Sequence, residues 1–168
     1  MTDYAELALL PEGLHDDLPP FAGHEARSIE NLVSQFESHG YERVKPPLIE
    51  FEESLLSGPG AGVARHMFRL MDPISQRMMG LRADMTIQVA RIAATRLRQA
   101  PRPLRLCYAG QVLRVRGSQL RPERQYAQAG VELIGADGVA GNGELLLLVA
   151  ESLSALGVQG LSVDLTIP

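Results

Sequence analysis

The chain has few of the residues that build crosslinked, metal-bound or membrane-spanning proteins. It has one cysteine, Cys107, no tryptophan and only 5% aromatic residues among 168 positions. One cysteine excludes an intrachain disulfide or a zinc cluster of several thiolates, and the four histidines lack metal-ligand spacing. The apolar run at residues 145–150 is too short to cross a bilayer and lies between Glu144 and Glu151. We therefore expect a cytoplasmic protein without a metal or cofactor.

Length and hydrophobic content are those of an ordinary folded domain. A chain of 168 residues with 45% hydrophobic residues can bury a core without crosslinks. The sequence has no repeat, no low-complexity tract and no internal domain boundary. We expect residues 1–168 to form a single domain.

The net charge of −4 conceals a strong segregation of charge along the sequence. Residues 1–64 hold 12 acids and 3 bases, residues 65–124 hold 13 arginines and 3 acids, and residues 125–168 hold 5 acids and no base. A basic centre favours a phosphate-bearing or otherwise anionic partner. The alternative is that these charges pair with one another in the folded chain.

Apolar periodicity and turn residues predict an α+β domain, an antiparallel β-sheet flanked by helices. Residues 58–62, rich in glycine, have the composition of a mobile loop, which we expect to order over a ligand. Asp84 is well placed to cap a helix. The predicted elements are helices at 21–39, 52–57, 84–99 and 144–156, strands at 41–44, 48–51 and 161–167, and a hairpin made of 67–71 and 77–82.

Residues 104–135 carry the most information, because they read as a second hairpin with polar groups on a shared face. Arg114 and Arg116 stand two apart where the first strand ends, and Gln128 and Glu132 stand four apart on the return strand. Small residues at 127, 129 and 130 would leave room for a ligand. The alternative is an ordinary solvated hairpin with its arginines outside.

Several segments, in chain order, resemble the class II aminoacyl-tRNA synthetase core, and specifically the histidyl-tRNA synthetase family. Residues 11–20 look like the start of that family, and HGYERVKPPLIE at 39–50 resembles motif 1. LRADMT at 81–86 stands where the synthetases have Leu-Arg-Pro-Glu-Gly-Thr. LCYAGQVLRVR at 106–116, with its return strand, resembles motif 2.

This resemblance implies a pocket for histidine. Asp84 and Thr86 would hold the ammonium group, Arg114 would bind a phosphate or carboxylate, and AQAGVELIG at 127–135 would contact histidine through Gln128 and Glu132. A buried zwitterion needs one carboxylate and one cationic donor, which Asp84 and Arg114 supply. Glu132 could accept a proton from an imidazole. The alternatives are a helix cap at Asp84 and ordinary cross-strand surface partners at Gln128 and Glu132.

Departures from the synthetase pattern point to a non-catalytic relative. Arg116 stands where active synthetases have a glutamate that helps to hold the adenine of ATP, and a fixed cation cannot make that contact. Asp84 is one methylene shorter than the family's glutamate, and the chain ends before the third motif. A histidine pocket with a spoiled ATP site resembles the ATP phosphoribosyltransferase regulatory subunits, of which LRADMT is typical.

That resemblance implies a regulatory subunit rather than an enzyme. It would assist the short-form ATP phosphoribosyltransferase catalytic subunit in the first step of histidine biosynthesis, with L-histidine as its ligand and self-association through motif 1. Members are longer than 168 residues, so we expect an N-terminal part of a longer protein; the alternative is an unusually short member. One alternative is the catalytic-core fragment of a histidyl-tRNA synthetase that activates histidine with ATP. The other, a nucleic-acid-binding module, is disfavoured by the few aromatic residues and the acidic net charge.

Overall fold

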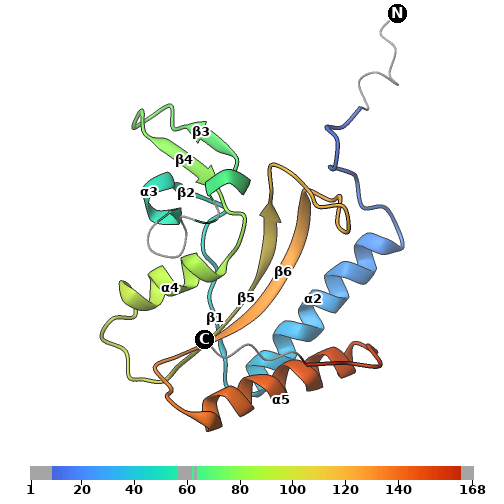
Figure 1. The fold of residues 1–168 in the computed structure, drawn as a ribbon, viewed down its shortest axis with the longest axis vertical. Coiled ribbons are helices and arrows are strands. Elements are labelled where there is room, and N and C mark those ends of the chain that lie inside the picture. Colours follow the sequence, from blue (N-terminus) through green and yellow to red (C-terminus); the bar gives the residue numbers. More distant parts are fainter. Residues whose placement is uncertain (1–8, 57–61, 63, 164–168) are drawn as a thin grey trace, which may run out of the picture.

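Two small β-sheets form the centre of the protein. A computed structural model describes residues 9–56, 62 and 64–163 (Figure 1). In the larger sheet, of order β1-β5-β6, the long antiparallel hairpin of β5 and β6 is extended by a short parallel partner, β1. The smaller sheet is antiparallel throughout, of order β2-β4-β3. The strands are β1 (Glu42–Arg43), β2 (Ile49–Phe51), β3 (Arg69–Met71), β4 (Met78–Leu81), β5 (Leu104–Leu113) and β6 (Gln125–Ile134).

Helices cover both faces of the long hairpin. In Figure 1, α4 lies on one side of β5 and β6, and α2 and α5 lie on the other. A short helix, α3, follows β2 directly. The helices are α2 (Phe21–Ser38), α3 (Glu52–Leu55), α4 (Thr86–Ala94) and α5 (Val139–Ala155).

Alternation along β5 supplies two separate hydrophobic cores. Leu106, Tyr108 and Val112 point to one face and pack with Met85 and Val89 at α4. On the opposite face, Cys107 is buried with the aromatic rings at 36 and 41 and with the leucine at 148. The hairpin therefore separates the two hydrophobic cores, so a site on one face does not share packing contacts with the core on the other face.

The α+β class, both hairpins and the first helix are confirmed, while several details differ. The chain has two sheets, one of them mixed, instead of a single antiparallel one. Helix α4 ends at Ala94, not near residue 99, because residues 95–99 tighten into turns. Helix α5 begins at Val139, five residues before its expected start. Residues 161–163 are not in a strand, residues 164–168 lie outside the described part of the chain, and so does the 58–62 loop apart from Gly62.

Within the described ranges, no helix combines the length and the apolar character that a bilayer span requires.

A polar cluster ties α5 to the beginning of β5. The guanidinium of Arg105 donates to both carboxylate oxygens of Glu144, at 2.7 and 2.8 Å, and the Tyr41 hydroxyl donates to the same carboxylate at 2.9 Å. These bonds, led by Arg105, lower the pKa of Glu144 to about 2. The cluster links three segments that are distant in sequence.

The Glu144 cluster should make stability depend on acid pH. Because folding lowers this carboxyl pKa, its contribution is present above the ordinary value of 4.5 and is lost as the pH falls toward about 2. We expect Glu144→Gln to reduce the free energy of unfolding at neutral pH. The same change should have much less effect as the pH approaches the lowered pKa of about 2. Urea unfolding of both proteins across this range measures the difference. A pH-independent difference would contradict the assignment.

Candidate functional site

The beginning of α4 lies over the middle of β6 and brings the predicted acid and amide together. The side-chain oxygen of Gln128 accepts a hydrogen bond from the backbone of Met85 at 2.9 Å, and its nitrogen donates to Asp84 at 3.1 Å. The other carboxylate oxygen of Asp84 accepts from the backbone of Thr86 at 2.7 Å. Met85, not Asp84, is the N-cap residue of α4, and the helix has no side-chain cap, so the expected helix cap at Asp84 is wrong. Asp84 instead closes a local turn with Thr86 and faces the β6 amide.

Tyr108 completes the cluster and was not predicted as a site residue. Its hydroxyl lies 3.1 Å from the Thr86 hydroxyl and donates to the carboxylate of Glu132 at 3.3 Å. Thr86 can donate to Tyr108 while Tyr108 donates to Glu132, so one chain of hydrogen bonds joins α4, β5 and β6. The signal that could have found Tyr108 is its even spacing from the motif 2 arginine, which places both on the same face.

The small residues of β6 do not leave the room that we expected for a ligand. Tyr108 is paired across the strands with Gly130, and a Cβ atom built on Gly130 would lie 2.6 Å from the Tyr108 hydroxyl. Ala129 packs against the core on the opposite face. The glycine is therefore required by the tyrosine ring that crosses it, and the expectation of an empty space there is wrong.

Burial sets the protonation chemistry of the cluster. It raises the pKa of Glu132, and the nearby charge of Asp84 adds to the effect while hydrogen bonds oppose it. Burial likewise raises the pKa of Tyr108 to about 12, so this hydroxyl remains a donor at neutral pH. Two carboxylates close together in a half-buried site favour a ligand that brings hydrogen-bond donors and positive charge.

Arg114 does not touch this cluster. Its backbone N–H donates to the carbonyl of Arg124 at 2.7 Å, which extends the hairpin by one step beyond the assigned strands. Gln128 lies four residues after Arg124 on the return strand, so it is about 13 Å from the Arg114–Arg124 pair at the usual rise per strand residue. Arg114 and Arg116 both lie beyond the end of β5 at Leu113, and both line one small pocket at the loop end of the hairpin. Contact of Arg114 with a histidine carboxylate stays a prediction.

A buried arginine supports the segment that carries Asp84. Arg82 is 7% exposed and donates to the carbonyls of Gln111 and Pro46, at 2.8 and 2.9 Å. A Cβ atom built on Gly110 would collide with its guanidinium. Arg82 therefore joins the two sheets two residues before the site, a role that charge alone did not reveal.

In the described ranges, no three His, Cys, Asp or Glu side chains gather as a metal site would need.

The fold is that of a class II aminoacyl-tRNA synthetase-like core. The structure of an ATP phosphoribosyltransferase regulatory subunit/histidyl-tRNA synthetase from Bacillus halodurans has a TM-score of 0.77 and 28% identity, covering 91% of this chain and 39% of that one. Apo histidyl-tRNA synthetase from S. aureus has a TM-score of 0.70 and 26% identity, covering 90% and 35%. The family model described as Histidyl-tRNA synthetase matches residues 13–168, and the chain belongs to this family.

Curated relatives within this family carry the name ATP phosphoribosyltransferase regulatory subunit. The one from Rhodospirillum centenum is 65% identical over 162 residues, covering 96% of this chain and 42% of the relative. The one from Paramagnetospirillum magneticum is 64% identical, covering 100% and 44%. The resemblance inferred from LRADMT and Arg116 is confirmed, and the chain spans less than half the length of these relatives.

Proposed function

We propose that the protein carrying this chain is a non-catalytic regulatory subunit of ATP phosphoribosyltransferase, which supports the first step of histidine biosynthesis and its feedback control by histidine. Relatives of that name are 65% and 64% identical to it. Arg116, at the position of the synthetases' adenine-binding glutamate, supports the absence of ATP-dependent activation. The natural partner is the short-form catalytic subunit, in a self-associating cytoplasmic complex.

The ligand in this proposal is L-histidine, bound at the cluster of Asp84, Thr86, Gln128 and Glu132. One observation carries it: Asp84 bonds to Gln128, and Tyr108 links Thr86 to Glu132, on a single face of the hairpin. Asp84 and Thr86 are positioned for the ammonium group, and the Glu132 carboxylate for an imidazole N–H. Arg114 would meet the carboxylate of the ligand. Each polar group of histidine then has a partner of opposite character.

Reconstitution tests the regulatory role directly. The full-length protein is co-purified with a short-form ATP phosphoribosyltransferase, and the catalytic rate is measured with and without it and with added histidine. We expect a stable complex, a higher rate in the complex, and a rate that falls as histidine is added. An unchanged rate with no complex formation would contradict the proposal.

A second candidate function is histidine activation, since the family model and the S. aureus structure belong to histidyl-tRNA synthetases. Its signature is exchange of pyrophosphate into ATP that depends on histidine. We expect no such exchange from the full-length protein. Strong histidine-dependent exchange of pyrophosphate into ATP would instead support the enzymatic function.

A further inference from the structure

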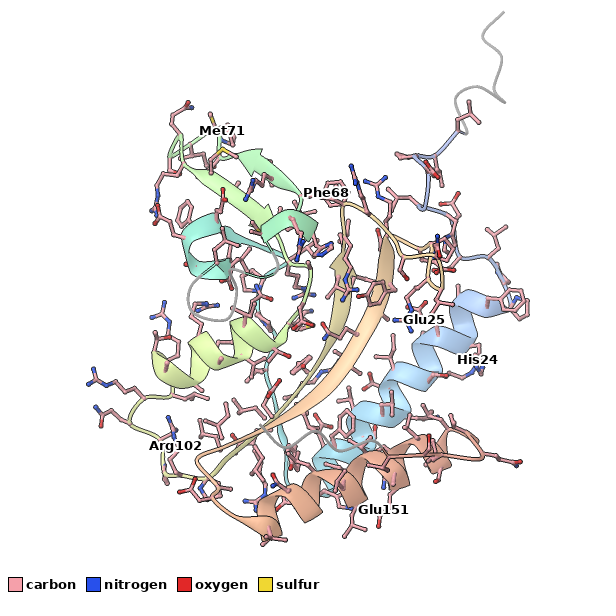
Figure 2. The ribbon with its side chains drawn as sticks, viewed as in Figure 1. His24, Glu25, Phe68, Met71, Arg102 and Glu151 are labelled. Atoms are coloured by element: carbon pink, nitrogen blue, oxygen red, sulfur yellow. The ribbon has the colours of Figure 1, made fainter. Side chains whose placement is uncertain are left out.

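The hydroxyl of Tyr108 is held in one place within the polar cluster at the beginning of α4. Tyr108 is 3% exposed and belongs to the hydrophobic core that contains Met85 and Val89. Its ring crosses Gly130, where an added Cβ atom would lie 2.6 Å from the hydroxyl. Figure 2 shows side chains filling the space between α4 and the hairpin, while α5, which carries Glu151, lies on the other side. The hydroxyl therefore cannot change its position as that of an exposed tyrosine can.

The charge of Glu132 sets the direction of the hydrogen bonds in this cluster. A carboxylate only accepts, and the Tyr108 hydroxyl has a single proton, which it donates to Glu132 at 3.3 Å. The contact of 3.1 Å between the Thr86 and Tyr108 hydroxyls then uses the proton of Thr86. Burial raises the pKa of Glu132, and hydrogen bonds from the Thr86 and Tyr108 hydroxyls oppose that rise. Both hydroxyl protons are thus directed into the cluster.

Thr86 and Asp84, the two side chains assigned to the ammonium group, can therefore only accept hydrogen bonds. With its proton directed inward, the Thr86 oxygen has only lone pairs left for a ligand. The Asp84 carboxylate accepts from Gln128 and from the backbone of Thr86, at 3.1 and 2.7 Å, and it has no proton to donate. A primary ammonium group brings three donors and no acceptor, so it matches these two side chains. A hydroxyl would bring a lone pair that faces other lone pairs.

We propose that Tyr108 is a positioning residue, which restricts the site to ligands with a primary ammonium group by keeping the proton of Thr86 away from the ligand. The inference rests on the proposed histidine site and deepens it, because it names a residue that discriminates among ligands with the same imidazole ring. In this arrangement Tyr108 acts through Thr86. Without the Tyr108 hydroxyl, the Thr86 hydroxyl is free to rotate and to donate to the ligand.

Two ligands that differ only in this group test the assignment. L-Histidine and L-imidazolelactate, which has a hydroxyl in place of the ammonium group, are each titrated calorimetrically into the full-length protein. We expect the wild type to bind histidine about a hundredfold more tightly than imidazolelactate. Tyr108→Phe keeps the ring in the core, and the ratio of the two affinities should fall by about fivefold or more. The reason is that Thr86 can then form one hydrogen bond to the hydroxyl of imidazolelactate.

Tyr41→Phe is the matched control for this experiment. Tyr41 is also buried, with 2% exposure, and donates to a carboxylate, that of Glu144 at 2.9 Å, but it belongs to the core on the opposite face of the hairpin. The control should leave the ratio of affinities within about twofold of the wild type. In a Thr86→Val background, adding Tyr108→Phe should not change the ratio, because no hydroxyl remains for Tyr108 to orient.

Two results would overturn the inference while the histidine site stands. One is an unchanged ratio in Tyr108→Phe, even if this variant binds both ligands more weakly, because such a uniform loss is structural. The other is an equal fall of the ratio in Tyr108→Phe and Tyr41→Phe. If the wild type did not bind histidine at all, the proposed function itself would be contradicted, and the inference with it.

Discussion

Replacing Glu132 by glutamine is expected to lower the affinity of the full-length protein for histidine by about tenfold or more. The carboxylate is half-buried and accepts a hydrogen bond from Tyr108 at 3.3 Å, so it is positioned to accept an imidazole N–H as a charged group. Glutamine has the same shape, so it keeps the packing but loses the negative charge. Loss of the charge from such a hydrogen bond lowers the binding affinity by about one to two powers of ten. Calorimetric titration with histidine measures the change.

The same variant should not lose stability. Because burial raises the pKa of Glu132 above its ordinary 4.5, its charged form at neutral pH opposes folding. This cost is present above the raised pKa and disappears below the ordinary value, so Glu132→Gln should melt at or above the wild-type temperature at neutral pH. Glu151→Gln, an exposed change on α5, serves as the binding control. If Glu132→Gln bound histidine with the affinity of the wild type, the assignment of Glu132 to the histidine site would be wrong.

Gly110→Ala should cause a large loss of stability. The new Cβ would collide with the Arg82 guanidinium, which is buried and bonded to the carbonyls of Gln111 and Pro46. We expect the free energy of unfolding to fall by about 1–3 kcal/mol, as in other overpacked cores. Histidine affinity should fall as well, since Arg82 holds the segment that begins α4.

The matched control adds the same methyl group where nothing opposes it. Gly143 lies inside α5, and a Cβ atom there meets no atom within 4 Å. Gly143→Ala should raise the free energy of unfolding by about 0.5–1 kcal/mol through helix propensity. Urea unfolding of both variants gives the comparison. Equal effects at the two positions would contradict the role assigned to Arg82.

Even spacing along strands made part of the site predictable. Gln128 and Glu132 had to share a face once they lay on one strand, and the resemblance placed Asp84 and Thr86 near them. The pairing of Tyr108 with Gly130 could not be derived in the same way. Register in a hairpin is set by its turn, and the long connection between β5 and β6 does not specify one.

Other differences come from tertiary contacts and from weak helix formers. Gly141 and Gly143 hid the first turns of α5, because glycine disfavours a helix that packing nevertheless stabilises. An arginine at a strand end suggests solvent, but Arg82 finds its acceptors at Pro46 and Gln111, which are remote in sequence. No local pattern contains that information.

Arg116 lies where a change of residue can alter the binding of a ligand without loss of the scaffold. It lies past the last paired residues of β5, is exposed, and contributes to neither hydrophobic core. Exchange of an acid for a base at such a place breaks no ladder hydrogen bond and opens no cavity. Ligand specificity can therefore change at the loop end of the hairpin, while the two hydrophobic cores on its faces continue to stabilise the fold.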